Sequence, residues 1–387
     1  MKLSTKFQST ELGKLPVEWC VRTLRELGKV HDGTHQTPKY VRDGVPFYSV
    51  EHVTSGDFNN TKFISLEEHR FLTRTFKMER GDVLMTRIGS IGECRLIDWD
   101  VDASFYVSLA LLKLRDIDAR YFAQYANSPM FKQEVELHSL PSAVPRKINL
   151  GPISDIRVAI PSVEEQRAIA TALSDIDSLI VGLERLIVKK HDIKQATMQQ
   201  LLTGQTRLPG FSGKWTAKEL GELCSLKSGQ TITTESIDDH SPYRCFGGNG
   251  LRGFTATYTH DGSHVLIGRQ GALCGNVIGV EGKFFASEHA LVASVRSDVA
   301  TTWLTYVLGR MNLNQYSESS AQPGLSAAKL LVLDVLSPPT REEQAAIAAI
   351  LSDMDIDLAA LESRLAKTRA IKQGMMQELL TGRTRLV

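Results

Sequence analysis

The 387-residue sequence contains no apolar run near the roughly 20 residues that a membrane-spanning helix needs. Its opening, MKLSTKFQST, lacks the apolar core of a secretion signal, so we expect a cytoplasmic protein. Its five cysteines are scattered and form no CxxC pair, which argues against a disulfide framework or a zinc knuckle. Neither sign of charge is in excess, with 45 Lys and Arg against 44 Asp and Glu. Any nucleic-acid binding must therefore depend on basic groups that are arranged locally.

Recognisable catalytic motifs are also missing. The segment Ser337-Pro338-Pro339-Thr340 shares only its two prolines with the (Asn/Asp)-Pro-Pro-(Tyr/Phe) turn of adenine methyltransferases. It is better explained as the exit of a strand into a helix cap. No GxxxxGK(S/T) phosphate-binding loop is present, so we do not expect ATP hydrolysis.

Two arrangements loosely suggest metal chemistry. Asp261 with Glu281 and Lys283 fits the spacing of a metal-dependent nuclease, but that spacing is permissive and the first half of the chain has no equivalent. Two histidine pairs with a spacing of four lie in the glycine-rich segments HDGTH (31–35) and HDGSH (260–264). Glycine disfavours the helix that would align such pairs on a metal. We predict no catalytic residue and no metal site in this chain.

The chain repeats itself at an offset of 178, where Glu164–Leu208 and Glu342–Leu386 share 25 of 45 positions without a gap. Each copy is predicted to form one long helix. Each opens with a hydroxyl residue three positions before a glutamate, the pattern of a capping box. These residues are Ser162 and Glu165 in the first copy, and Thr340 and Glu343 in the second. Gly204 and Gly382 lie where the chain must turn left-handed to end a helix.

Apolar residues recur every three or four positions along both repeats, which predicts a coiled-coil stripe, here called the helix seam. It comprises Leu173, Ile176, Ile180, Leu183 and Ile187 in the first copy and Leu351, Met354, Leu358, Leu361 and Leu365 in the second. The first half of each copy is acidic and the second half is basic. Antiparallel pairing sets acidic against basic halves and opposes the helix dipoles, so we predict an antiparallel coiled coil with an internal pseudo-two-fold repeat. The alternative is two independent amphipathic helices, each buried in its own domain.

A globular unit precedes each repeat, and the two units are faintly similar. Trp19 matches Trp215, and GDVLMTRIGSIGE (81–93) resembles SHVLIGRQGALCG (263–275). Both units alternate short β-rich runs with glycine-rich turns and a few helical segments, so we predict an α+β fold. The predicted segments are a first domain at residues 1–160, a first long helix at 161–206, a second domain at 207–337 and a second long helix at 338–387.

Taken in order, these segments resemble the specificity subunit of a type I restriction-modification system. The resemblance rests on the opening GKLPVEWCVRTLRELGKVHDGTHQTPKY, the turn DVLMTRIGSIG, and the boundary IPSVEEQRAI, which recurs as PPTREEQAAI. The helix ends QQLLTGQTRL and QELLTGRTRL contribute to it, as does FGGNG with GRQGALCG in the second unit. The likeness covers essentially the whole chain, and the recurrence of its motifs in both halves makes it specific.

The resemblance implies a DNA sequence-recognition subunit that is not itself an enzyme. Its two target-recognition domains would each read one half of an asymmetric bipartite site in double-stranded DNA. The paired helices would set the spacer and dock two methyltransferase (modification) subunits, and two restriction translocase-nuclease subunits would complete a phage-defence complex in a bacterial or archaeal cytoplasm. The chain would need no cofactor, whereas its partners are expected to use S-adenosylmethionine, ATP and Mg²⁺.

Three other functions remain compatible with the sequence. The same fold could serve a methylation-only complex or another defence system. Alternatively, the coiled coil itself could be the functional part of a scaffold whose domains bind protein or sugar. The weakest alternative is a freestanding nuclease that uses Asp261.

Candidate DNA contacts were chosen by side-chain chemistry. Arg suits guanine, Asn or Gln suits adenine, and Lys, Arg and hydroxyl groups suit phosphates. In the first domain the candidates are His35, Gln36, Thr37, Lys39, Tyr40, Arg42, Arg87, Ser90, Arg146 and Lys147. In the second domain they are Asn249, Arg252, Arg269, Gln270, His289, Gln322 and Lys329.

Some of these candidates have an equally good structural explanation. Arg87 and Arg269 align across otherwise divergent units, and a matched residue is a better candidate for a structural or phosphate-directed role than for reading different bases. Loop residues that differ between the units are better candidates for specificity. The basic cluster Arg70–Arg80 either follows phosphates or is an ordinary solvated helix face.

Overall fold

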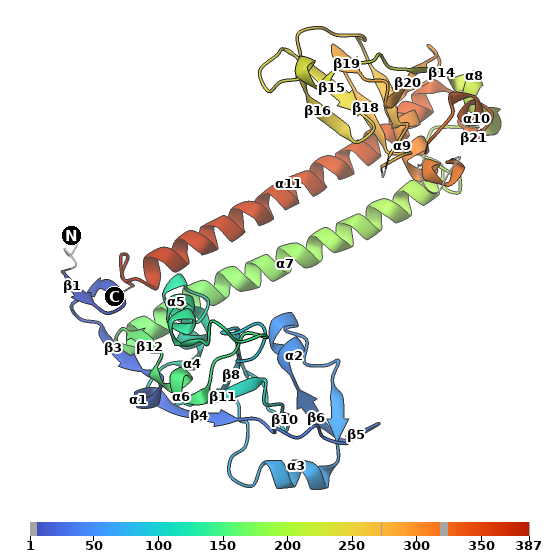
Figure 1. Ribbon diagram of the computed structural model, residues 1–387. Helices are drawn as coiled ribbons and strands as arrows, with labels where there is room; N and C mark the ends of the chain where they lie inside the picture. The colour runs from blue at the N-terminus through green and yellow to red at the C-terminus, as the bar shows by residue number, and fades with distance from the viewer. Residues whose placement is uncertain (1–5, 272, 318–323, 387) are drawn as a thin grey trace. The chain divides into compact units, whose positions relative to one another are not determined.

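The computed structural model describes residues 6–271, 273–317 and 324–386, and its contacts divide the chain into two units. The first unit comprises residues 1–183 and 364–387, and the second comprises residues 184–363. Each unit contains one globular domain and half of each long helix (Figure 1). This division differs from the four segments predicted from the sequence, because each helix is shared between the units.

The first unit is built on small sheets. Strands β1 (Phe7–Thr10) and β2 (Gly13–Pro16) form a hairpin, and β3 (Cys20–Thr23) pairs antiparallel with β12 (Arg157–Ile160). An antiparallel sheet has the order β4 (Gly28–Asp32), β11 (Leu109–Leu114), β8 (Val83–Thr86), β9 (Cys94–Leu96). A second sheet has the order β10 (Ser104–Phe105), β6 (Val45–Tyr48), β7 (Lys62–Ile64), β5 (Tyr40–Val41). The helices are α1 (Leu24–Leu27), α2 (Val50–Ser55), α3 (Leu66–Leu72), α4 (Ala119–Tyr125), α5 (Pro129–His138) and α6 (Leu150–Asp155).

The second unit uses the same elements with fewer additions. Strand β13 (Thr216–Glu219) pairs antiparallel with β21 (Asp334–Ser337). One sheet has the order β14 (Cys224–Ser228), β20 (Ala290–Val295), β17 (His264–Gly268), β18 (Val277–Val280), and the other has β16 (Gly250–Thr255), β15 (Tyr243–Gly247), β19 (Phe284–Ala286). The helices are α8 (Leu220–Leu223), η1 (Thr234–Ser236), α9 (Thr301–Arg310), η2 (Leu313–Tyr316) and α10 (Ala327–Leu331).

The two domains share one topology. Strands β4, β11, β8 and β9 correspond in order and direction to β14, β20, β17 and β18. In the second sheet of each unit, the strand before the central β11 or β20 pairs parallel with an earlier strand, as β10 with β6 and β19 with β15. These correspondences confirm the predicted α+β fold with an internal repeat. Strand β7 corresponds to β16, because each pairs antiparallel with the strand before it, and the first unit adds β5, α2 and α3 between the shared elements.

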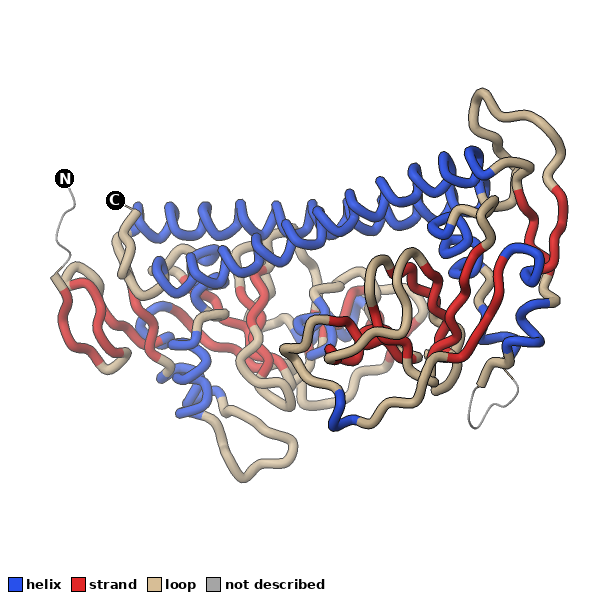
Figure 2. Tube along the Cα trace, turned by 90° about the horizontal axis from the view of Figure 1, so that it is seen from above, coloured by secondary structure: helices blue, strands red, loops and turns tan. Residues whose placement is uncertain are grey.

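The long helices α7 (Val163–Leu201) and α11 (Arg341–Leu379) each span 39 residues and pair antiparallel. In the first unit Lys372 forms an ion pair with Asp177 at 2.6 Å, and in the second unit Lys194 forms the equivalent pair with Asp355. The helices run side by side in both views (Figures 1 and 2). The paired charges are related by the 178-residue offset, so the contacts confirm the predicted pairing of acidic with basic halves.

Burial follows the helix seam. All of the seam residues are buried or half-buried, with Leu173 and Leu351 fully buried, whereas Leu179, Val188 and Ile356 face solvent. The start of α7 and the end of α11 also enter the core of the first domain, where Ile169 and Leu379 pack with the aromatic residues of α4. The alternative of two independent helices is therefore wrong.

The predicted capping boxes are only half formed. The hydroxyls of Ser162 and Thr340 accept hydrogen bonds from the backbone N–H groups of Glu165 and Glu343, both at 3.2 Å. The glutamate side chains do not return to the cap, because each is buried and engaged elsewhere. At the other ends, Gly204 and Gly382 have φ of 69° and 68°, as the left-handed turn requires.

The two buried glutamates bind the same kinds of partner. Glu165 accepts from the Trp19 indole at 3.0 Å and from the Arg385 guanidinium at 2.6 and 2.8 Å. In the second unit these contacts recur among Glu343, Trp215 and Arg207, at 3.2, 2.9 and 2.7 Å. The matched tryptophans of the sequence therefore mark a repeated junction between each domain and its helices.

The next residue of each repeat forms a second junction. The side-chain oxygens of Gln166 and Gln344 accept from the backbone N–H groups of Asp118 and Ala300, both at 2.8 Å. Those groups lie at the starts of α4 and α9, where a helix leaves N–H donors unsatisfied. The repeated Glu-Glu-Gln motif thus orients each domain on its helices.

Candidate nucleic-acid interface

In the first unit, two candidate segments meet across strand β11, where β4 ends on one side and the chain leaves β8 on the other. Arg87 follows β8 and is 8% exposed, and its guanidinium donates to the Asp32 carboxylate at 2.5 Å. Asp32 ends β4, and its other oxygen lies 2.8 Å from Nε2 of the exposed His35. Burial and an acidic partner favour the structural explanation for Arg87 and bring His35 into the same network.

A third segment of candidates lies beside the turn after Arg87. The N–H of Gly89 donates to the Arg146 carbonyl at 2.8 Å, and a β-bridge joins Ile88 to Lys147. Ser90 and Lys147 are exposed here, whereas the Arg146 side chain forms an ion pair with Glu136 on α5. The fold therefore gathers Ser90, Arg146 and Lys147 around the Arg87 turn.

The remaining candidates of the first unit follow His35 along an exposed loop. Gln36, Thr37, Lys39 and Arg42 are exposed, and the Thr37 hydroxyl lies 3.5 Å from that of Tyr106. The ring of Tyr40 lies 6.1 Å from that of Phe47 and 4.8 Å from the Lys62 ammonium. Lys62 was not among the candidates, because nothing in the sequence places it beside Tyr40.

In the second unit, Arg269 occupies the backbone position of Arg87. Its N–H donates to the His289 carbonyl at 2.9 Å, as that of Arg87 donates to Ser108. Its side chain is half-buried and donates to the Ser228 hydroxyl at 3.1 Å. Among the described residues, no carboxylate forms an ion pair with it.

Gln270 and His289 form a network beside Arg269. Nδ1 of His289 lies 3.0 Å from the Gln270 side-chain oxygen, and Nε2 lies 3.2 Å from a carboxylate oxygen of Glu288. The other carboxylate oxygen of Glu288 is buried without a partner among the described residues. Sequence reasoning overlooked Glu288 because acidic residues were not sought at a DNA-binding face; its place beside His289 was the available signal.

The FGGNG segment (residues 246–250) packs against the backbone of Gln270 and His289. A Cβ on Gly248 would lie 3.0 Å from the Gln270 carbonyl oxygen and 3.1 Å from that of His289, which is tighter than ordinary van der Waals contact, so glycine favours this close approach. Asn249 and Arg252 are exposed on the segment, and Arg252 lies over Gly247. Five of the candidates in this unit are therefore adjacent, namely Asn249, Arg252, Arg269, Gln270 and His289.

Two candidates of this unit remain. Lys329 is exposed on α10 and has an interaction partner. Gln322 lies outside the described residues.

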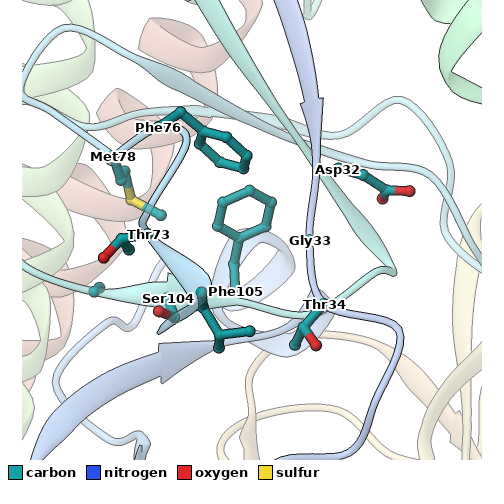
Figure 3. A pocket seen from close by; sticks show the side chains of 10 residues that line it. Asp32, Gly33, Thr34, Thr73, Phe76, Met78, Ser104 and Phe105 are labelled. Carbon is teal, nitrogen blue, oxygen red and sulfur yellow. The ribbon is translucent and has the colours of Figure 1, made fainter. Parts of the chain in front are cut away.

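A cavity of about 120 Å³ is lined on one side by Asp32, Gly33 and Thr34. Figure 3 shows Phe76, Met78 and Phe105 around it, with the Asp32 carboxylate pointing away from the rings. The ring of His31 stacks on that of Phe76, with 4.3 Å between the ring centroids. Burial and the nearby charge of Lys113 lower the pKa of His31. The ring is therefore neutral near pH 7 and serves packing.

The basic cluster of the first unit lies on and directly after α3. Arg74 stacks on the exposed ring of Phe71 at 4.9 Å, and Lys77 lies 3.9 Å from Asp102. Arg70 and Arg80 are exposed. The cluster is exposed, but only Arg70 lies on a helix, because α3 ends at Leu72.

The loosely metal-like residues do not assemble into a metal centre. Among residues 6–271, 273–317 and 324–386, no group of three His, Cys, Asp or Glu side chains could hold an ion. Asp261 is exposed in a turn whose Gly262 carbonyl accepts from the N–H of Gly282 at 3.1 Å.

Within those same ranges, no helix has the length and apolarity that a membrane crossing requires.

Comparison with known proteins matches both halves of the chain to one family. The family described as the type I restriction modification DNA specificity domain matches residues 16–190 and again 212–369. These matches cover more than half of the chain, which therefore belongs to that family. The double match corresponds to the two units of the fold.

Individual relatives are similar over shorter stretches. The type I restriction enzyme EcoprrI specificity subunit of Escherichia coli is 49% identical over 142 residues, which are 36% of this chain and 35% of that protein. The MjaVIII specificity subunit of Methanocaldococcus jannaschii is 26% identical over 215 residues, 53% of this chain and 50% of that protein. The chain thus matches about a third to a half of the length of these curated relatives.

Solved structures resemble the fold along nearly its whole length. A type I restriction-modification S subunit from M. genitalium has a TM-score of 0.66 at 18% identity, covering 97% of this chain and 99% of that one. The HsdS subunit of Thermoanaerobacter tengcongensis has a TM-score of 0.51 at 16% identity, covering 97% and 100%. At such identities the likeness concerns the fold.

Proposed function

We propose that this chain is the DNA sequence-recognition subunit of a type I restriction-modification complex. Each domain reads one half of an asymmetric bipartite site in double-stranded DNA, and the paired helices set the unread spacer between the halves. The observation that carries this proposal is one framework used twice with different side chains at the same exposed turn. His35 and Asp32 accompany Arg87 in the first unit, whereas Ser228 and Gln270 accompany Arg269 in the second.

The helices also offer a surface for partner subunits. Exposed apolar side chains lie on both helices outside the seam. In the first unit these are Val163, Leu179, Val181 and Ile371, and in the second they are Leu186, Val188, Ile193 and Ile356. Large exposed apolar residues gathered on one element favour protein contact. Ile193 and Ile371 are counterparts at the 178-residue offset, and each unit thus offers exposed apolar side chains on which one of two methyltransferase subunits can dock.

Catalysis in this proposal belongs to the partners. Two methyltransferase subunits use S-adenosylmethionine, and two restriction translocase-nuclease subunits use ATP and Mg²⁺. The complex acts in the cytoplasm, where its DNA substrate lies. This chain contributes recognition without a cofactor of its own, and Asp261 has no catalytic part.

The test compares substitutions in the two recognition surfaces. Full-length chains carrying Gln36→Ala with Tyr40→Ala, or Asn249→Ala with Arg252→Ala, are assembled with their methyltransferase subunits, and methylated adenines are mapped by sequencing exposed DNA. We expect each variant to relax one half-site and leave the other unchanged. Arg120→Ala serves as a control, because that exposed side chain pairs with its own helix cap, Asp118.

Two outcomes of this experiment contradict parts of the proposal. Loss of preference in both half-sites from either variant would show that the domains do not read separately. Sequence-independent binding by the unchanged complex would remove the recognition function and leave the scaffold alternative. ATP-dependent cleavage of unmodified DNA, measured alongside, distinguishes a restricting complex from a methylation-only one.

A further inference from the structure

The chain of contacts Arg87–Asp32–His35 places an acidic residue at a face proposed to bind a polyanion. A carboxylate at such a face repels phosphates unless a neighbouring cation balances its charge. Asp32 is half-buried, and its two oxygens are divided between two partners. Oδ1 lies 2.5 Å from the Arg87 guanidinium and Oδ2 lies 2.8 Å from Nε2 of His35.

Arg87 is held in place by the backbone around it. Its N–H donates to the Ser108 carbonyl and its own carbonyl accepts from the N–H of Ile148, both at 2.9 Å. Its Nε donates to the Ile148 carbonyl at 3.3 Å. The guanidinium therefore balances the charge of Asp32 from a fixed position and cannot reach a DNA base without breaking these contacts.

The backbone between Asp32 and His35 is equally constrained. A Cβ on Gly33 would lie 2.4 Å from the Tyr106 carbonyl, so only glycine fits there. The N–H of Thr34 donates to the Phe105 carbonyl at 3.1 Å, and the Thr34 carbonyl accepts from the N–H of Val107 at 2.9 Å. His35 thus projects from an anchored segment, while its side chain remains 71% exposed.

The contact with Asp32 also determines which ring nitrogen of His35 is left for a ligand. A carboxylate can only accept, so Nε2 carries the proton that it donates, and Nδ1 of the neutral ring becomes an acceptor. No described residue contacts Nδ1 by a hydrogen bond. In the major groove, the matching donors are the exocyclic amino groups of adenine and cytosine.

We propose that Asp32, fixed by Arg87, is a positioning residue that makes His35 accept a hydrogen bond from the amino group of an adenine or cytosine in the half-site read by the first unit. This assignment rests on the proposed DNA-recognition function. The second unit lacks the arrangement, because Ser228 stands in the place of Asp32 and carries no charge. The effect is therefore confined to one half-site.

The test couples protein variants to altered bases, using the full chain in complex with its methyltransferase subunits. Binding is measured on duplexes in which the amino group of each adenine or cytosine of the first half-site is removed in turn. We expect His35→Ala to weaken binding about 5- to 10-fold, the lower end of the range for a good bidentate base contact, because His35 makes a single hydrogen bond. At one position, removing the amino group should have the same effect, with no further loss when both changes are combined.

Asp32→Asn tests the positioning role separately. It should reproduce the loss of preference at that same base and cause no additional loss in a His35→Ala background, because Asp32 acts through His35. A purely structural role would instead lower thermal stability and weaken binding in both backgrounds. His35→Ala leaves the Asp32–Arg87 pair intact, so the test does not depend on the folding of the Asp32 variant.

Three results would overturn the assignment, and each differs from failure of the proposed function. A uniform loss on all sequences with a smaller salt dependence would make His35 a phosphate contact. Additive losses from His35→Ala and every amino deletion would mean that His35 reads no amino group. An unchanged affinity in His35→Ala, with selective binding retained, would remove His35 from the interface. Failure of the proposed function itself would appear as non-selective binding by the unsubstituted complex.

Discussion

The two units place an arginine at the same point of one framework and give it different surroundings. Arg87 is buried against Asp32, whereas Arg269 is half-buried and donates to the Ser228 hydroxyl. The difference arises from one residue at the end of the strand two places along the sheet, β4 or β14. Equivalent arginines therefore differ in their surroundings because the opposing side chain decides whether a carboxylate neutralises the charge.

The junctions between domains and helices show the opposite behaviour. Glu165 and Glu343 keep the same tryptophan and arginine partners in both units. A repeated scaffold thus retains the contacts that orient each domain, while the exposed turns diverge. This contrast can be tested by comparing how much matched substitutions in the two units lower the free energy of unfolding.

The largest expected effects are at the repeated junction. Glu165→Gln and Glu343→Gln should each destabilise their unit by about 3–5 kcal/mol, the cost of leaving a buried charge without its partner. Glu165→Gln should lower the free energy of unfolding less than Glu343→Gln does, because Arg385 keeps a second carboxylate partner, Glu18, at 3.0 Å. Thermal unfolding measures each loss of stability, and limited proteolysis shows in which unit the loss occurs. Glu164→Gln and Glu342→Gln are controls at exposed neighbouring positions, and equal effects in controls and variants would refute the buried-junction explanation.

Equivalent seam positions should differ in proportion to their burial. Leu358 is 4% exposed and Ile180 is half-buried, although the 178-residue offset makes them counterparts. We expect Leu358→Glu to cost about 2–4 kcal/mol by lost packing and carboxylate burial, and Ile180→Glu roughly half as much. Leu179→Glu, at a 40% exposed position, is the control. The measurement is chemical unfolding; a larger loss for Ile180 than for Leu358 would contradict the burial order.

The sequence predicts the helices well because their signals are local and repeated. Periodicity gives the seam, and the segregation of Asp and Lys residues gives the antiparallel direction, which Asp177 with Lys372 confirms. The capping-box prediction was half wrong, because Glu165 is used by a tryptophan 146 residues away. Local patterns cannot reveal such a competing partner, although the recurrence of Trp, Glu and Arg in both halves was a signal of it.

The recognition surface was less predictable for a related reason. Side-chain chemistry selects Arg87 and Arg269 alike, but their different partners depend on which strand end lies opposite. Asp32 and Glu288 were not considered, because charge alone counts against acidic residues near DNA. Their histidine contacts give each a local role that composition cannot show.

Removing the matched arginines should separate stability from binding. Arg87→Ala should destabilise the first unit by about 1–3 kcal/mol, less than a fully buried pair because Asp32 is partly solvated. Arg269→Ala should change stability by less than about 0.5 kcal/mol and weaken DNA binding. Thermal unfolding and binding at two salt concentrations measure the two effects. The opposite pattern, with Arg269 essential for stability and Arg87 dispensable, would reverse their assigned roles.

The smallest expected effect comes from giving the second unit the acidic partner of the first. In Ser228→Asp, the new carboxylate should hold Arg269 and gain only about 0.2–1 kcal/mol in stability, as partly exposed ion pairs do. If Arg269 contacts a phosphate, DNA affinity should fall and the salt dependence should decrease by about one unit. Ser228→Asn is the uncharged control, and Ser228→Asp in an Arg269→Ala background measures simple repulsion of DNA. An equal loss in both backgrounds would show that the carboxylate acts by repulsion alone and that Arg269 does not contact DNA.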